Sequence, residues 1–271
     1  MIPTTNSPTS WQVKAGQVAH GIRRRVLEHT IESNGGYLSQ ACSAAEILAA
    51  MYIKIMNLGP SLAPPVPPAF PGVPGPDNRG YFTGAAYNGA KSPDTDRFFL
   101  SPSHYSLVLY AALIETGRMA PEGLVQFNQD GGTVEMIGAE HSPGMEIMTG
   151  SLGQGLSQAA GIALARKRRS DSGRVWVFMS DGEFQEGQTW EALQAMSFYG
   201  LDNTGIYVDV NRQQCDGRME DVMNVEPLAA RLESFGAKVF SVDGHDLDAL
   251  AAPAEKIHPN QPLVVLAQTN P

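Results

Sequence analysis

From Arg174 to Glu183 the sequence reads R-V-W-V-F-M-S-D-G-E, a short and nearly continuous apolar run that ends in Ser-Asp-Gly-Glu. A strand buried on both faces of a parallel sheet has this composition, because neither face meets water. A helix is predicted over Glu186 to Tyr199, and T-G-I-Y-V-D-V from Thr204 to Val210 predicts the next buried strand. This order of strand, helix and strand predicts a βαβ unit.

The flanking sequence continues the alternation on both sides. Toward the C-terminus, helices are predicted over Leu228 to Phe235 and Leu247 to Ala252, and strands over Ala237 to Val242 and Pro262 to Gln268. Toward the N-terminus, helices are predicted over Gly16 to Glu32, Ala44 to Met56 and Ser103 to Glu115, with a short strand over Phe98 to Leu100. We therefore expect an α/β fold with a mainly parallel sheet and helices on both faces.

Composition narrows the class of protein. The chain has 271 residues, of which 42% are hydrophobic and 17% charged, so we expect a globular protein of one large domain or two small ones. The net charge of −9 opposes nucleic-acid binding, which needs cationic surface. No apolar run is long enough for a membrane span, and Met1 to Trp11 does not resemble an export signal. The two cysteines, Cys42 and Cys215, form no motif, and we expect a cytoplasmic protein.

The stretch from Pro60 to Pro76 holds eight of the nineteen prolines. Proline fixes φ and lacks a backbone donor, so this stretch is expected to be a surface insertion without helix or strand. An extended ligand for another protein is the alternative interpretation.

Polar residues follow two neighbouring strands of the predicted sheet. Asp181 comes directly after the first strand and Asn211 directly after the next. The carboxyl ends of parallel strands meet at one edge, where ligands of such sheets bind. A carboxylate, an amide oxygen and a backbone carbonyl suit Mg²⁺. Taken alone, however, the pattern also fits two ordinary turns.

A glycine-rich loop, T-G-S-L-G-Q-G from Thr149 to Gly155, precedes a helix that is predicted to run to about Arg169. Backbone N–H groups at such a helix start can meet an anion. The spacing matches neither nucleotide-binding fingerprint. A tight turn with close helix packing would explain the glycines equally well.

Four segments together resemble the transketolase family. S-D-G-E-F-Q-E-G-Q-T-W-E-A from Ser180 and V-D-V-N-R-Q-Q-C-D-G from Val208 resemble its thiamine-diphosphate motif, and T-G-S-L-G-Q-G-L-S and V-D-G-H-D resemble two further signatures. The resemblance covers about Gly16 to Thr269 and corresponds to the diphosphate-binding domain alone, which implies a single domain over 1–271. It implies the N-terminal subunit of a split enzyme, whose partner, a C-terminal transketolase-like subunit in an α₂β₂ assembly, supplies the pyrimidine-binding domain and its glutamate.

The resemblance also implies roles for individual residues. Asp181, Asn211 and the Gln213 carbonyl would hold Mg²⁺, with Ca²⁺ or Mn²⁺ as alternatives. Glu186 would belong to a proton network at the subunit interface, although a glutamate in the first turn of a helix is common without such a role. The remaining residues that the resemblance places beside thiamine diphosphate are Gly150, Ser151, Leu152, Gly182 and Glu183.

Three histidines are candidates for moving protons on substrate hydroxyls, namely His104, His141 and His245. The resemblance places His104 and His245 beside the cofactor as well. Two departures are visible, since Ser103 replaces a glycine of the family and Tyr37 stands where a histidine is usual. The other three histidines, His20, His29 and His258, are expected to be ordinary surface or helix residues.

The resemblance implies transfer of a two-carbon ketol unit from a ketose or ketose phosphate to an aldehyde. Two alternatives remain open at this point. Tyr37 also fits a ligase or decarboxylase that uses a 2-oxo acid, and a non-catalytic scaffold subunit would retain the cofactor motif.

Overall fold

The computed structural model describes residues 10–33 and 36–271. The prediction that the chain begins without an export signal concerns Met1 to Trp11, and residues 1–9 of that stretch lie outside the described ranges. Among the described residues, five strands form one fully parallel sheet in the order β1-β2-β3-β7-β6. The strands are β1 (Arg97–Leu100), β2 (Val175–Ser180), β3 (Thr204–Val210), β6 (Lys238–Asp243) and β7 (Leu263–Gln268). The predicted α/β fold is confirmed.

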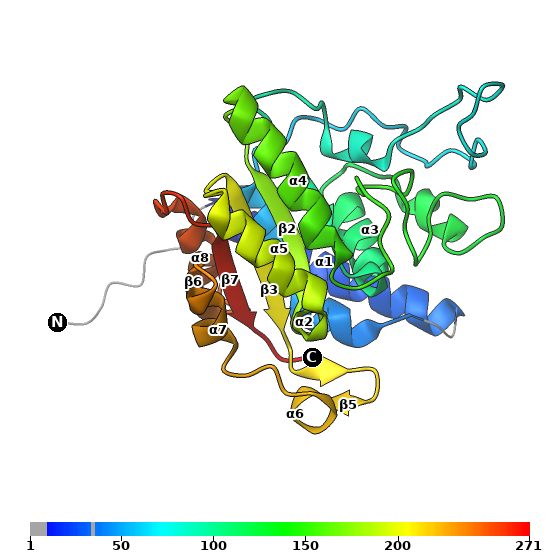
Figure 1. The fold of residues 1–271 in the computed structure, drawn as a ribbon. Coiled ribbons are helices and arrows are strands. Elements are labelled where there is room, and N and C mark those ends of the chain that lie inside the picture. The colour runs from blue at the N-terminus through cyan, green and yellow to red at the C-terminus, as the bar shows by residue number, and fades with distance from the viewer. Residues whose placement is uncertain (1–9, 34–35) are drawn as a thin grey trace.

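Helices cover both faces of this sheet (Figure 1). One face carries α1 (Ser10–Ser33), α2 (Leu38–Ala50), α3 (Ser106–Glu115) and α8 (Leu247–Ala251). The other face carries α4 (Gln154–Arg169), α5 (Gly187–Phe198) and α7 (Leu228–Ser234). A short hairpin of β4 (Gln213–Gln214) and β5 (Gly217–Arg218) leads into α6 (Met219–Val222) beyond the sheet.

Side chains along each strand point alternately to the two faces of the sheet, so each face has its own hydrophobic core. In β2, Trp176 and Phe178 pack toward α1, α2 and α3, whereas Val175, Val177 and Met179 pack toward α4 and α5. Every residue of β2 and β3 is buried, as their continuous apolar composition predicts.

Several helix boundaries differ from those predicted. The first helix begins at Ser10 and the second at Leu38, because polar positions there continue helices that apolar spacing alone does not reveal. A π-helical turn over Met51–Ile55 follows α2. The Met56 N–H bonds to the Met51 carbonyl across five residues, so the helix widens before it ends.

The stretch from Pro60 to Pro76 contains no helix or strand, as proline predicts. It packs on the segment that follows α3. The Ala120 N–H donates to the Pro65 carbonyl at 2.7 Å, and the Thr133 hydroxyl donates to the Pro68 carbonyl at 2.9 Å. The stretch is thus bonded to its own chain at several points.

Candidate functional site

The carboxyl edge of the sheet brings Asp181 and Asn211 together. Parallel register pairs Ser180 of β2 with Asp209 of β3, so the residues that follow these strands leave the sheet side by side. Both line a cleft of about 840 Å³ with Gln213 and with the residues that follow β7, which are Thr269, Asn270 and Pro271. In Figure 1 the arrowheads of β2, β3 and β7 point toward this end of the molecule.

A tight turn joins the two predicted ligands. Arg212 has a φ of 58°, in the left-handed region that side chains other than glycine rarely adopt. The Arg212 N–H donates to Asp181 Oδ2 at 2.8 Å, and the Gln213 N–H donates to Asn211 Oδ1 at 2.9 Å. Gln213 lies exposed at the start of the β4–β5 hairpin. The turn thus contains two of the predicted ligands, Asn211 and Gln213, and bonds to the third, Asp181.

A buried network behind this loop fixes the side chain of Asn211. Asp209 Oδ2 accepts hydrogen bonds from the Tyr105 hydroxyl at 2.7 Å, the Ser43 hydroxyl at 2.6 Å and Asn211 Nδ2 at 3.2 Å. Asn211 Nδ2 also donates to the Tyr105 oxygen at 3.1 Å. Because a carboxylate can only accept, the amide nitrogen must face Asp209, and Oδ1 therefore faces the loop.

The electrostatics of this edge favour a cation. Asp181 is 2% exposed and Asp209 is fully buried. Burial, with the charge of Asp209 as a smaller contribution, raises the pKa of Asp181 to about 7. In the part of the chain that the structure describes, no Lys, Arg or His forms an ion pair with either carboxylate.

The donor set at this edge fits a hard divalent ion. Asp181 offers a carboxylate oxygen, Asn211 an amide oxygen and Gln213 a backbone carbonyl, and Mg²⁺ binds such oxygens while it keeps waters or phosphate oxygens. Residues 10–33 and 36–271 hold no group of three or more His, Cys, Asp or Glu that could bind a metal. The set at this edge has a single carboxylate, so it depends on a ligand of the ion for further negative charge.

The glycine-rich loop is anchored next to this edge by Glu183. One oxygen of Glu183 accepts bonds from the Ser101 hydroxyl at 2.5 Å and the Gly153 N–H at 3.0 Å. The other accepts from the Ser180 N–H at 3.1 Å, which completes a capping box. Glu183 is fully buried, so its carboxylate holds the loop rather than lining the cleft.

Two glycines of this loop are required by its geometry. Gly150 has a φ of 111°, and a Cβ there would lie 2.6 Å from the side chain of Ile137. Gly153 has a φ of 78°, and a Cβ there would lie 2.7 Å from the Cβ of Glu186. Ser151 is exposed and Leu152 partly exposed between them. Gly182 lies against Gln214, whose Nε2 would be 3.1 Å from an added Cβ.

His104 lies in a 3₁₀ turn, Ser103–Tyr105, that follows β1 at the same edge. Burial lowers its pKa to about 4, so the imidazole is neutral near pH 7. The Tyr37 ring lies edge-on to it, with 6.3 Å between ring centroids. The tyrosine that departs from the family pattern is thus a direct neighbour of His104.

His245 follows β6 and uses both ring nitrogens. Nδ1 lies 3.0 Å from Glu46 Oε2, and Nε2 accepts a bond from the Asn270 N–H at 3.0 Å. Because Asn270 lines the cleft that also contains Asp181 and Asn211, this hydrogen bond places His245 directly behind the cleft wall.

His141 belongs to a different cluster. Its Nε2 lies 3.1 Å from Glu135 Oε2, and its ring packs on the Phe70 ring with 4.6 Å between centroids. Phe70 comes from the proline-rich stretch, which therefore contacts one of the predicted histidines. Glu186 lies exposed at the start of α5, with its Cβ against Gly153 of the glycine-rich loop.

The three histidines expected to be ordinary are not all alike. His20 is exposed on α1, and His29 is partly exposed on the same helix. The expectation for His258 is wrong, because His258 is only 6% exposed and lies in a loop. Its Nδ1 bonds to the Gln261 carbonyl at 2.7 Å, and Arg174 lies 2.9 Å from its Nε2.

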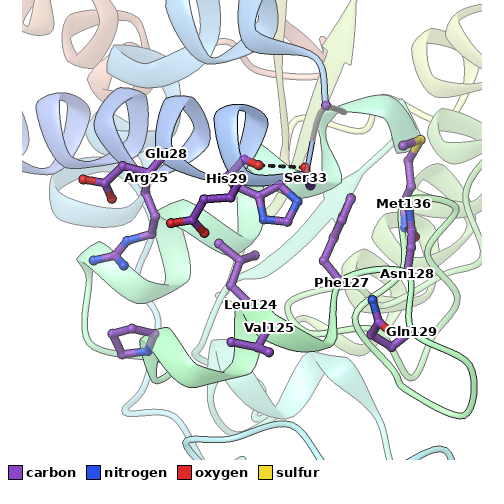
Figure 2. Close-up of a pocket in the computed structure, with 13 residues that line it drawn as sticks. Arg25, Glu28, His29, Ser33, Leu124, Val125, Phe127, Asn128, Gln129 and Met136 are labelled. Carbon is purple, nitrogen blue, oxygen red and sulfur yellow. Dashed lines mark hydrogen bonds between the residues drawn. The ribbon is translucent and has the colours of Figure 1, made fainter.

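A second cavity lies between the end of α1 and the segment 121–136 (Figure 2). Its volume is about 590 Å³, and its lining contains none of the predicted site residues. His29 and Phe127 face this cavity and pack edge to face, with 5.0 Å between ring centroids.

Sequence reasoning missed three further site residues. Asp209 lies within the segment that begins at Val208 but is not singled out there, although an aspartate inside a strand buried on both faces is a signal that could have identified it. Tyr105 adjoins a predicted histidine but gives no indication of its bond to Asp209. Glu46 lies 199 residues from His245 in the chain, and the sequence near either residue does not predict their contact.

Comparison with known proteins assigns the fold and the domain. The family described as "Transketolase, thiamine diphosphate binding domain" matches residues 83–269. A putative transketolase family protein of Sinorhizobium fredii is 37% identical over 256 residues, which cover 93% of this chain and 82% of that protein.

Two further matches bear on the length of the chain. A 6-deoxy-6-sulfo-D-fructose transketolase subunit of a Clostridium species is 30% identical, with 95% of this chain and 85% of the relative covered. A transketolase of Pichia stipitis, solved with xylulose 5-phosphate, superposes with a TM-score of 0.77 at 26% identity. That match covers 95% of this chain but only 36% of the solved one. The chain therefore spans little more than a third of a solved transketolase.

Proposed function

The chain belongs to the transketolase family, and from this premise we propose that it is the diphosphate-binding subunit of a split, two-subunit enzyme. The proposed reaction transfers a two-carbon ketol unit from a ketose or ketose phosphate to an aldehyde, with thiamine diphosphate and Mg²⁺. The observation that carries the proposal is the placement of Asp181 and Asn211 side by side at the carboxyl edge, next to the anchored glycine-rich loop.

Residues of this chain would hold the cofactor by its anionic end. Asp181, Asn211 and the Gln213 carbonyl would bind Mg²⁺, and Gly150, Ser151, Leu152 and Gly182 would lie beside the diphosphate. When it is bound, thiamine diphosphate supplies the carbanion chemistry that breaks and forms the carbon–carbon bond. The buried network around Asp209 would keep the Asn211 oxygen facing the ion.

Histidines at the rim would act on the substrate. His104 is neutral near pH 7, so it can accept a proton from a hydroxyl or donate a hydrogen bond through its N–H. His245 would form hydrogen bonds to ligands at the cleft wall through Nε2. His141, whose ring packs on Phe70 of the proline-rich stretch, would be a further histidine that moves protons on substrate hydroxyls. Glu186, exposed at the start of α5, is available to a partner subunit.

The match to subunit-named relatives supports a partner. Subunit-named relatives are matched over most of their length, whereas the solved transketolase extends far beyond the match. A C-terminal transketolase-like subunit would supply the pyrimidine-binding domain and its glutamate, in an α₂β₂ assembly. Among the described residues, no helix has the length and apolar character that a membrane crossing needs.

The first test is an affinity purification of this chain from its source, with co-purifying proteins identified by mass. We expect a stoichiometric partner that carries a pyrimidine-binding domain, and turnover with ketose donors only when both chains are present. Asp181→Ala should abolish that turnover. Release of CO₂ from a 2-oxo acid during turnover would instead establish the ligase or decarboxylase alternative, and a complex without any turnover would establish the scaffold.

A binding experiment tests the metal placement without turnover. Asn211→Ala should weaken Mg²⁺-dependent thiamine diphosphate binding by about tenfold or more, far more than it changes the melting temperature without cofactor. Asn203→Ala is the matched control, because Asn203 precedes β3 and donates to the Ala163 carbonyl, at the opposite end of the same strand. Equal cofactor affinity in Asn211→Ala and the parent would disprove the placement.

A further inference from the structure

His245 is held by an ion pair from the opposite end of the chain. Glu46 of α2 bonds to His245 Nδ1 through Oε2. Arg23 of α1 forms an ion pair with the same carboxylate. Its Nη1 lies 2.6 Å from Glu46 Oε1, and its Nη2 donates to Glu46 Oε2. Arg23 is itself fixed by a 2.9 Å bond from Nη2 to the Cys42 carbonyl. Arg23 of α1 thus holds Glu46 of α2, and Glu46 in turn bonds to the imidazole of His245.

The partners of the ring determine where its proton sits. Burial alone would raise the pKa of Glu46, but hydrogen bonds from Arg23 and His245 and the charge of Arg23 lower it overall, so Glu46 is ionised near neutral pH. A carboxylate can only accept, so Nδ1 carries the proton. The Asn270 N–H can only donate, so Nε2 is the acceptor. The geometry therefore specifies the Nδ1–H tautomer.

This tautomer leaves one atom of the ring free to change partner. Nε2 points at Asn270, which lines the cleft with Asp181 and Asn211. A ligand that replaces the Asn270 N–H meets Nε2, which either accepts a bond from a hydroxyl or takes up a proton. In the second case the Glu46 carboxylate supplies the charge that balances an imidazolium beside an oxyanion.

We propose that Glu46 is a positioning residue for His245: held by Arg23, it keeps the proton on Nδ1 and leaves Nε2 as the one ring atom that exchanges hydrogen bonds and protons with ligands in the cleft. The tautomer stands on the contacts of the chain itself, and only the identity of the ligand rests on the proposed function. The role is separate from those of the Mg²⁺ ligands, which Glu46 does not touch.

The helix α1 offers a matched control. Arg25 pairs with Glu115 of α3, with Nε 2.8 Å and Nη2 2.6 Å from Oε1. The carboxylates of the two pairs are similarly buried, with 15% of the Glu46 side chain and 17% of the Glu115 side chain exposed. Glu115→Gln therefore removes a comparable ion pair from the same helix without a histidine partner.

The experiment is ¹⁵N NMR of the full chain labelled at histidine, with the His245 signals assigned by their loss in His245→Asn. In the parent we expect a protonated Nδ1 and an unprotonated Nε2, and a protonated Nδ1 again after addition of thiamine diphosphate with Mg²⁺. In Glu46→Gln we expect a shift toward the Nε2–H tautomer, whereas Glu115→Gln should match the parent. Glu46→Asp, which keeps the charge, should restore part of the parent pattern.

Two results would overturn the proposal. One is a parent chain in which Nδ1 of His245 is unprotonated, a measurement that needs no variant to fold. The other is a His245 spectrum in Glu46→Gln that equals that of the parent.

Cofactor affinity separates this proposal from the proposed function. Titration with thiamine diphosphate and Mg²⁺ should show binding about tenfold weaker in Glu46→Gln and within about twofold of the parent in Glu115→Gln. A parent chain that has the expected tautomer but binds no cofactor, alone or with its partner, would contradict the proposed function while the tautomer upholds the role of Glu46.

Discussion

The hydroxyl group of Tyr105 connects the predicted metal ligand Asn211 to the buried carboxylate of Asp209. It donates to the carboxylate and accepts from the amide, so its loss leaves Asn211 with one contact fewer on its nitrogen. The orientation of the Asn211 side chain then depends on Asp209 and on the Gln213 N–H. A substitution at Tyr105 thus tests how strongly this network supports the site.

We expect Tyr105→Phe to weaken Mg²⁺-dependent cofactor binding by about tenfold and to lower the free energy of unfolding by about 1 kcal/mol. Titration of the cofactor and urea unfolding measure the two effects. Tyr110→Phe is the control, because Tyr110 is also fully buried and its hydroxyl donates to the Glu135 carbonyl at 2.6 Å. If both variants bind the cofactor equally well, the network does not support the site.

His104 makes the stability of the chain depend on pH. Its pKa falls from 6.5 to about 4 on folding because of burial, so the unfolded chain binds a proton between these values and the folded chain does not. Stability is therefore unaffected above 6.5 and decreases as pH falls toward 4. In His104→Gln this contribution is absent.

The measurement is the difference in melting temperature between the parent and His104→Gln across this pH range. We expect the difference to be constant above pH 6.5 and to turn against the parent as the pH falls to about 4. A difference that does not change with pH would show that His104 titrates equally in the folded and unfolded chain.

The turn that follows β2 is the element that ties the glycine-rich loop to the sheet. Glu183→Ala removes the acceptor of three hydrogen bonds and leaves buried donors on Ser101, Ser180 and Gly153 without it. We expect the free energy of unfolding to fall by about 2–4 kcal/mol, as measured by urea unfolding. Glu191→Ala on the exposed face of α5 should change it by less than about 0.5 kcal/mol. A loss no larger than that of Glu191→Ala would mean that the capping box contributes little.

Elements with a strong periodicity were predictable, and those shaped by distant contacts were not. The strand from Thr204 to Val210 has the predicted bounds, because a run of buried apolar residues ends where Asn211 begins. The π-helical turn over Met51–Ile55 has no counterpart in the apolar pattern, which continues through it. The same limit applies to the site, since Asp181 and Asn211 follow strands whereas Glu46 reaches His245 only through the folded chain.

The two hydrophobic cores share one sheet, and on this ground we propose that residues 10–33 and 36–271 fold as parts of the single domain predicted over 1–271. Leu48→Ala lies in the core that contains α1 and α2, and Leu193→Ala in the core that contains α4 and α5. Each should lower the free energy of unfolding by about 2–5 kcal/mol. Each should also shift the whole transition rather than half of it.

Tryptophans on both faces report this transition. Trp176 belongs to the first core and Trp190 packs on the second, so fluorescence and circular dichroism should give the same midpoint in the parent and in both variants. Val125→Ala is the control, because Val125 is 79% exposed. Two separate transitions would divide the chain into independent units.

The position of β7 between β3 and β6 bears on how the protein is made on the ribosome. Synthesis proceeds from the N-terminus, so β6 leaves the ribosome before the only described strand with which it pairs in the sheet. Until β7 emerges, the nascent chain holds β1, β2 and β3 with an open edge on β3, and β6 has no neighbour to join. Among the described residues, the cleft wall that follows β7 and contacts His245 is therefore completed last, and a nascent chain cannot complete this cleft before almost all of the described residues have been translated.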